Sequence, residues 1–319
     1  EDRLIGVIEI PTFYADFAAQ QKGDPNYRST TRDVRRLVKA LKEKGVEGLI
    51  VDLRSNGGGS LQEADTMTGL FIKSGPTVQV KSARRRANVL QDNNLELAWD
   101  GPMAVMVNRL SASASEIFAG AMQDYGRALI LGNQTFGKGT VQTLIPLNRG
   151  QLKLTAAKFY RISGQSTQHQ GVIPDIAFPE LVDSSVIGES TLEGAMPWDR
   201  ITPAKYRPIT SFSPFIPSLK TKHALRAAND PYFQYYRSLS ERSEERSERK
   251  LLSLNETTRR AERAKDDIWR LDTENELRIA IGKPEAETLE DLKDLQEEEA
   301  KMAKSALTEA STEESAGAT

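Results

Sequence analysis

The stretch MAVMVNRLSASASEIFAGAMQDYGRALIL, residues 103–131, carries the patterns of a strand, a turn, a helix and a second strand, in that order. Residues 103–107 form an uninterrupted apolar run, which is typical of a buried strand. Residues 128–131 have the pattern of the next strand, and the segment between the strands is helical, ending at Gly126. One face of this expected helix, residues 115–125, carries Ile117, Phe118, Ala121 and Met122. The stretch therefore predicts an α/β layer architecture.

Similar patterns on both sides extend the α/β prediction over about the first 180 residues. Apolar runs and alternating patterns predict strands, and apolar residues at helical spacing predict helices. The additional strands are expected at residues 4–10, 48–53, 140–147 and 151–159, and the additional helices at residues 30–44 and 61–73.

The chain of 319 residues is long enough for about two domains. We expect a compact core at residues 1–180 and an irregular connector, rich in Pro, Ser and Thr, at residues 181–219. Residues 220–307 are strongly charged and favour helix, which predicts a helical C-terminal extension. Residues 308–319 are small and polar, which predicts a disordered tail.

The composition excludes several kinds of function. The chain has no Cys, so it has neither disulfides nor a thiol nucleophile. Neither His169 nor His223 has the spacing of a metal ligand, and no metal or cofactor is expected. The formal charge of -2 gives no general attraction for nucleic acid, and the basic run at residues 84–86 is interpreted as a solvated loop. No run approaches the ~18 apolar residues of a membrane span, so nothing indicates membrane association.

Ser113 and Lys138 are the candidate catalytic pair. Ser113 lies where a strand gives way to a helix, between two alanines that leave room for a substrate, and Lys138 lies between two glycines. With no Cys and few His residues, a serine nucleophile with a lysine base fits the composition. Such a lysine must be buried, so that its pKa falls from ~10.4 to roughly 7–8. Gln142 is placed to orient the amine without adding charge.

Other readings of these residues remain open at this point. A serine at a helix N-terminus is commonly a cap, and Ser111, Ser113 and Ser115 all suit that role. A lysine is most often a surface residue. His169 is an alternative base for a serine nucleophile.

Residues 52–61 place three successive glycines between a buried strand and a helix. Such a turn lets the backbone approach a ligand closely, and its free N–H groups are able to bind a developing oxyanion. The alternative is a tight strand-to-helix turn with no ligand. Residues 132–138 also match most of a nucleotide-binding P-loop. However, Gly139 stands at the position of the Mg²⁺-binding hydroxyl, and a strand pattern follows in place of the helix that such a loop needs.

Four motifs, at residues 53–61, 111–116, 137–142 and 171–175, resemble those of the C-terminal processing peptidases. They occur in the order of that family and cover about the first 180 residues. Within the family the chain is most similar to the periplasmic tail-specific proteases of Gram-negative bacteria, and the charged region after residue 220 resembles their C-terminal extension. The resemblance implies a core with the ClpP/crotonase-like α/β fold and a periplasmic location.

The resemblance also implies roles for individual residues. Ser113 is expected to be the nucleophile, Lys138 the general base and Gln142 the residue that positions the lysine. The oxyanion hole is expected at Gly59 and Ala114, with Gly58 shaping the turn. Supporting positions of the site are expected at Glu116, Asp124 and Thr135.

The resemblance further implies substrates that are proteins or peptides with accessible C-termini, and an adaptor protein is a further candidate partner. Family members carry a PDZ domain before the glycine turn. Residues 1–52 leave no room for one, so we expect it upstream of this chain or absent.

The leading prediction is thus a serine endopeptidase. The alternatives are a catalytically latent interaction module, built on the charged helical part, and a P-loop-like NTPase.

Overall fold

The computed structural model describes residues 3–316, and the side chains of all of these except 303, 304 and 306–316. The chain divides into two compact units, residues 1–222 and 223–319, and each is considered by itself. The division falls close to residue 220, where the sequence predicts that the helical extension begins.

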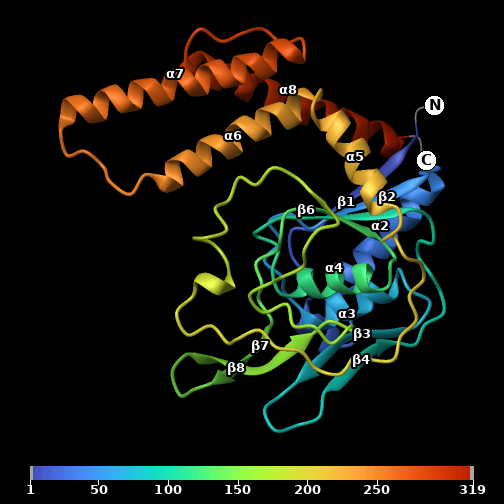
Figure 1. Ribbon diagram of the computed structural model, residues 1–319. Coiled ribbons are helices and arrows are strands. Elements are labelled where there is room, and N and C mark those ends of the chain that lie inside the picture. The colour runs from blue at the N-terminus through green and yellow to red at the C-terminus, as the bar shows by residue number, and fades with distance from the viewer. Residues whose placement is uncertain (1–2, 317–319) are drawn as a thin grey trace. The chain divides into compact units, whose positions relative to one another are not determined.

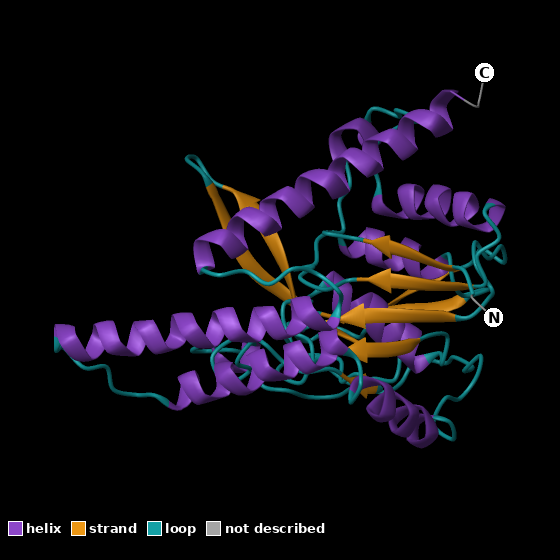
Figure 2. Ribbon diagram, turned by 90° about the horizontal axis from the view of Figure 1, so that it is seen from above, coloured by secondary structure: helices purple, strands orange, loops and turns teal. Residues whose placement is uncertain are grey.

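A parallel five-stranded sheet organises the first unit (Figure 1). Its order is β1-β2-β5-β6-β9, every pair is parallel, and the arrows lie side by side pointing the same way in Figure 2. The strands are β1 (Ile5–Glu9), β2 (Gly48–Asp52), β5 (Met103–Val107), β6 (Leu129–Gly132) and β9 (Ile176–Ala177).

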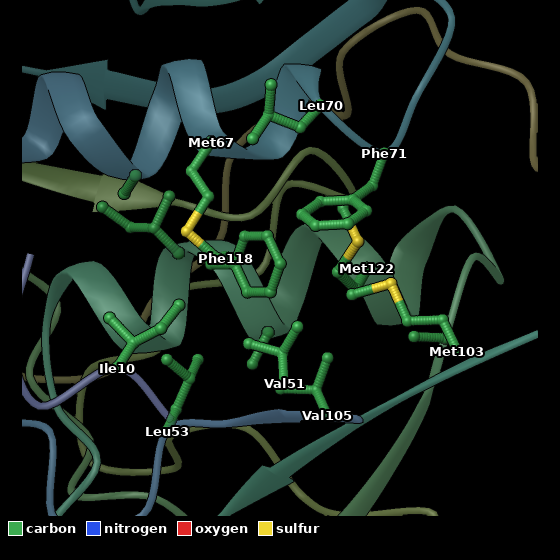
Figure 3. Close-up of a cluster of buried hydrophobic side chains, with 14 of the residues drawn as sticks. Ile10, Val51, Leu53, Met67, Leu70, Phe71, Met103, Val105, Phe118 and Met122 are labelled. Carbon is green, nitrogen blue, oxygen red and sulfur yellow. The ribbon is translucent and has the colours of Figure 1, made fainter. Parts of the chain in front are cut away.

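Helices cover this sheet and close the hydrophobic core (Figure 3). Val51 and Val105 of the sheet lie under Met67 of α3 and Phe118 of α4, and all four side chains are fully buried or nearly so. The ring of Phe71, just after α3, meets the ring of Phe118 edge to face at 5.7 Å. The helices of this unit are α1 (Phe17–Gln21), α2 (Thr30–Glu43), α3 (Leu61–Gly69) and α4 (Ala114–Asp124).

A second, antiparallel sheet has the order β4-β3-β8-β7, with β7 at one edge. Its strands are β3 (Gly75–Lys81), β4 (Asn88–Asp92), β7 (Thr140–Pro146) and β8 (Gln151–Tyr160). The sequence patterns predict β7 and β8 but miss β3 and β4, because Gly75 and Pro76 have the appearance of helix terminators. Pro76 lies beside a register shift in β3, a position where a strand tolerates proline. The expected helix at 61–73 accordingly ends at Gly69, four residues early.

After β9 the chain runs without regular structure apart from η1 (Glu189–Thr191), until α5 (Ile216–Ala227). This is the region where the sequence predicts an irregular connector. The basic run at residues 84–86 lies in the turn between β3 and β4 and is exposed, as expected of a solvated loop.

The second unit is helical, which confirms the prediction of a mainly α-helical C-terminal region. Its helices α6 (Pro231–Glu248) and α7 (Glu256–Ala280) lie side by side (Figures 1 and 2), and α8 (Leu289–Ala316) follows. Asp266 of α7 pairs with Arg242 and Arg246 of α6. Among the described side chains of this unit, few apolar groups are buried. Ion pairs, the hydrogen bond from the Tyr235 hydroxyl to Glu274 and the Arg242 contact with the Trp269 ring are among the contacts between α6 and α7.

The helix α8 extends further than the sequence predicts. Residues 308–319 are expected to be a disordered tail, but the helix continues to Ala316. Alanine and glutamate in this region favour helix, and that propensity outweighs the small polar residues. Residues 317–319 lie outside the described part of the chain. None of the described helices is long and apolar enough to cross a membrane.

Candidate active site

Three loops meet at one edge of the parallel sheet because each follows the carboxyl end of a neighbouring strand. The glycine turn follows β2, the serine segment follows β5, and the lysine segment follows β6. In open α/β sheets, ligands bind at the carboxyl ends of the strands. The topology thus joins three segments that are far apart in the sequence.

These loops surround a cavity of about 360 Å³. Ser113, Lys138 and Gln142 line it together with Gly59 and Ala114, so five of the residues singled out from the sequence share one cavity. The cavity has polar and apolar lining residues, and the apolar ones include Leu61, Ile117, Val141 and Phe159.

Ser113 is the N-cap residue of α4 and has an unusual backbone conformation, with φ 59° and ψ -111°. A positive φ is strained for any residue with a Cβ, and such strain is found mainly where surrounding contacts impose it. One of those contacts is the hydrogen bond that the Ser113 N–H donates to Glu116 Oε2 at 2.7 Å. The side chain is half-buried and borders the cavity.

Lys138 lies just before β7 and is half-buried at the border of the cavity. Its Nζ donates a hydrogen bond to Gln142 Oε1 at 3.3 Å, as expected if Gln142 orients the amine. Burial lowers the pKa of Lys138, and the positive charge of Lys153 lowers it further. The negative charges of Glu189 and Glu116 act in the opposite direction. The environment therefore shifts the equilibrium of Lys138 towards the neutral amine, which is the direction that a general base requires.

The glycine turn passes very close to two other segments. A Cβ at Gly58 would lie 2.7 Å from the Ala112 carbonyl oxygen, and one at Gly59 would lie 2.2 Å from the Phe13 carbonyl oxygen. Both residues also have positive φ angles, 102° and 141°. Glycine is thus required at both positions, and the turn is held against the serine segment.

Among the described residues, the N–H groups of Gly59 and Ala114 donate no hydrogen bond to protein. Both residues line the cavity beside Ser113, so these two donors are available to an oxyanion. The N–H of Gly58, by contrast, donates to Asn56 Oδ1 at 2.9 Å. Gly58 therefore shapes the turn.

Glu116 joins the serine segment to the lysine segment. Its carboxylate is fully buried and accepts hydrogen bonds from the Ser113 and Lys138 N–H groups, at 2.7 and 3.0 Å. It also accepts from the Thr135 hydroxyl at 2.6 Å and the Gly137 N–H at 2.7 Å. Burial raises the pKa of Glu116 to about 7, and these hydrogen bonds hold it from rising further. Glu116 and Thr135 thus lie where supporting residues are expected.

We expect Glu116→Gln to destabilise the site more than its small change in shape implies. Oε2 accepts hydrogen bonds from two N–H groups, and Oε1 accepts from an N–H group and a hydroxyl. The NH₂ group of glutamine at either position would therefore point at groups that also donate, and the hydrogen bonds there would be lost. Stability should fall by about 2–6 kcal/mol, as estimated for two buried donors left unsatisfied. Urea unfolding of the variant measures the loss. Glu193→Gln, which changes an exposed carboxylate outside the cavity, is the control and should change stability far less.

Asp124, the third expected supporting residue, lies away from the cavity. It is the last residue of α4, at the opposite end from Ser113. Its carboxylate pairs with Arg161 at 2.5 Å and accepts from the Ser163 hydroxyl at 3.0 Å. These contacts hold the C-terminal end of α4 and lie outside the cavity.

Ser111 and Ser115 tie the serine segment to the loop after β2, so neither is a helix cap. The Ser111 hydroxyl donates to the Leu53 carbonyl at 2.8 Å, and the Ser115 hydroxyl donates to the Asn56 carbonyl at 2.9 Å. Both serines are fully buried.

Two further residues of the site were not assigned a role from the sequence. Asn56 is fully buried and donates to the Ile10 carbonyl at 2.7 Å, in addition to its bond with Gly58. Arg109, also buried, donates to the carbonyls of Thr135 at 2.8 Å and Ile187 at 2.6 Å. An asparagine inside a glycine turn is a detectable signal for the first. The second has no local signal, since its partners are distant in sequence.

Two alternative readings receive no support from the geometry. Thr140 begins the strand β7, so the P-loop-like segment lacks the helix N-terminus that binds phosphate. His169 does not line the cavity of Ser113. Among the described residues no group of His, Asp and Glu is placed to hold a metal ion.

The fold and the cavity define an α/β protein in which a strained serine and a lysine with a lowered pKa share one site. Residues 4–178 match Peptidase family S41, and residues 182–318 match the C-terminal domain of tail specific protease. The chain belongs to peptidase family S41, with the C-terminal domain of the tail-specific branch.

Curated relatives agree with this assignment. The chain is 43% identical over 300 residues to the tail-specific protease of Haemophilus influenzae, covering 90% of this chain and 41% of the relative. It is 39% identical over 177 residues to the carboxy-terminal-processing protease of Bartonella bacilliformis, covering 52% of this chain and 41% of that protein. The chain thus spans about two fifths of the length of these relatives.

Among solved structures, the photosystem II D1 C-terminal processing protease is similar to this chain with a TM-score of 0.48 and 28% sequence identity. The match covers 60% of this chain and 48% of that one.

Proposed function

We propose that this protein is a serine endopeptidase in which Ser113 is the nucleophile and Lys138 the general base. The observation that carries the proposal is the shared cavity, in which a lysine with a lowered pKa lies with a serine at a helix N-terminus. The two unpaired N–H groups at Gly59 and Ala114 support the same conclusion. Together they supply the three elements of acyl transfer: nucleophile, base and oxyanion donors.

The reaction follows from these positions. The neutral Lys138 amine takes the proton from the Ser113 hydroxyl as the oxygen attacks the substrate carbonyl. The oxyanion of the tetrahedral intermediate accepts hydrogen bonds from the Gly59 and Ala114 N–H groups. Lys138 then returns its proton to the leaving amine, and the C–N bond breaks to leave an acyl-serine ester. Water, activated by the same amine, hydrolyses the ester and frees Ser113.

Gln142 keeps the amine in place through these steps without contributing charge. A carboxylate in its position would stabilise the ammonium form and weaken the base. The neutral amide orients Nζ through its oxygen and leaves the pKa of Lys138 low.

The names of the relatives support a substrate class of proteins that are recognised through their C-terminal region. The proposal needs no cofactor, and its partners are protein or peptide substrates, with an adaptor protein as a further candidate. A periplasmic location is proposed from the likeness to bacterial tail-specific proteases.

Covalent trapping tests the proposal directly. A peptidyl electrophile that reacts with activated serines should modify Ser113, and mass spectrometry of the digested protein locates the adduct. Labelling should increase as pH rises through the lowered pKa of Lys138, because the amine must lose its proton to act as a base. Labelling that survives Lys138→Ala at the wild-type rate would exclude the lysine as the base.

The helical second unit is proposed to handle substrates or partners, since its charged helices offer steering and weak contacts to extended polypeptides. We therefore expect a protein ending at Lys222 to keep its Ser113 reactivity. The first unit contains all the cavity residues, and the division between units falls after this residue. Turnover of a protein substrate should fall. Loss of Ser113 labelling with an intact circular dichroism spectrum would show that the second unit helps to build the site.

A further inference from the structure

Lys153 is a second cation of the Ser113 cavity, and the proposed dyad gives it no role. Its side chain lines the cavity together with Lys138, and the residues that line this cavity include no carboxylate. Lys153 is exposed, and it forms no ion pair among the described side chains. Its charge is therefore not neutralised by a neighbour in the described part of the chain.

One extra residue in β8 determines which way Lys153 faces. Val141 of β7 pairs with Ala157, but the next residue, Gln142, pairs with Thr155, so Ala156 has no partner. Such a bulge adds one residue to one strand of an antiparallel pair. Because side chains alternate between the two faces of a strand, a shift of one residue exchanges the faces of everything beyond it.

The bulge places Lys153 on the face of Gln142. Lys153 lies opposite Leu144, two residues beyond Gln142, and alternate residues of a strand share a face. With regular pairing, Leu154 would occupy that face instead. The bulge therefore puts an ammonium group, in place of a leucine side chain, on the side of the sheet where Lys138 bonds to Gln142.

We propose that Lys153 is a positioning residue whose positive charge disfavours a proton on Lys138 and so maintains the neutral amine that accepts the Ser113 proton. This inference rests on the proposed function. The charges that act on the Lys138 amine come from Lys153 of β8, Glu116 of α4 and Glu189 of η1. Both glutamates favour the ammonium form, so among these charges Lys153 alone acts for the neutral amine. Burial of Lys138 acts in the same direction and has the larger effect.

The test compares Lys153→Gln, Lys153→Glu and Lys153→Arg in the 319-residue protein. The first measurement is kcat/KM against pH for a fluorescently labelled unfolded polypeptide. At a pH where the wild type is half-maximally active, Lys153→Gln should lose roughly threefold and Lys153→Glu roughly tenfold. Lys153→Arg should behave as wild type, and all variants should reach the same plateau at high pH. Arg149→Gln removes a positive charge from the exposed turn of the same hairpin and should have little effect.

The second measurement needs no turnover. Acylation of the Lys138 amine by acetic anhydride, followed by mass spectrometry, reports the neutral fraction of this amine at each pH. The labelling curve should move to higher pH in the Gln and Glu variants, and the displacement should shrink as salt screens the charge. A labelling curve for Lys138 that is unchanged in Lys153→Glu would overturn the inference. A lower plateau of kcat/KM with no shift of the pH profile would also overturn it. Failure of the proposed function gives a different result from failure of this inference. If the proposed function is wrong, cleavage survives in the Ser113→Ala variant.

Discussion

Ser113→Ala should abolish peptide-bond cleavage and leave the fold intact. The hydroxyl is the attacking group in the proposed mechanism, and Ser113 is the one serine among the residues that line the cavity. Rate losses for catalytic nucleophiles are about 10⁶-fold, so activity should fall below detection in a standard assay. Alanine keeps the Cβ and hence the same backbone preference at φ 59°, and the Ser113 N–H bond to Glu116 does not involve the side chain. Cleavage of an unfolded polypeptide measures the effect.

The neighbouring serines provide matched controls. Ser111→Ala and Ser115→Ala each remove an identical hydroxyl two residues from Ser113, but each hydroxyl bonds a carbonyl of the loop after β2. These variants should lose about 1–3 kcal/mol of stability and retain cleavage. If Ser113→Ala cleaves as fast as the wild type, the nucleophile is another residue.

Lys138→Arg should be as damaging as Lys138→Ala. An arginine keeps the positive charge but does not lose its proton at accessible pH, so it has no lone pair to accept the serine proton. We expect both variants to lose at least about 10³-fold in kcat, a loss at the scale of general-base removal. A lysine that binds substrate through its charge would instead be replaced in part by arginine. Substantial turnover in the arginine variant therefore contradicts the dyad.

The pH dependence of the wild type adds a second check on Lys138. Because burial and Lys153 lower the pKa of this amine, kcat/KM should increase with pH and level off below the range of an exposed lysine. Gln142→Glu should move the rise to higher pH, because a carboxylate would stabilise the ammonium form. A profile that falls over this range would show that the protonated amine is the active form.

The parts of the fold with strong apolar patterns were predictable, because periodicity reports burial directly. The runs at 48–53 and 103–107 became β2 and β5, and the face beginning at Ile117 became the buried side of α4. Their parallel order, and hence the meeting of the three loops, follows from topology rather than from any local pattern. The strands β3 and β4 were missed because Pro76 resembled a helix terminator.

The site divides in the same way. Ser113, Lys138 and Gln142 lie in short motifs with distinctive glycine and alanine neighbours, and the structure brings them into one cavity. The sequence does not predict that Lys153 lines the site or that Asn56 and Arg109 contact it. Their effect depends on contacts between segments 26 to 78 residues apart, or on a bulge that changes the face of a strand. The identity of a side chain alone reveals neither its distant contacts nor the face of a strand on which a bulge places it.

The positive φ of Ser113 has a consequence for how this protein would respond to selection. Glycine would adopt the same conformation without strain, so Ser113→Gly should gain about 1 kcal/mol of stability, after its larger entropy cost in the unfolded chain. The same change removes the nucleophile. A library selected only for thermal tolerance should drift towards glycine at this position, while one selected for turnover should retain serine. The strain at residue 113 is thus a direct local case of the trade-off between stability and activity.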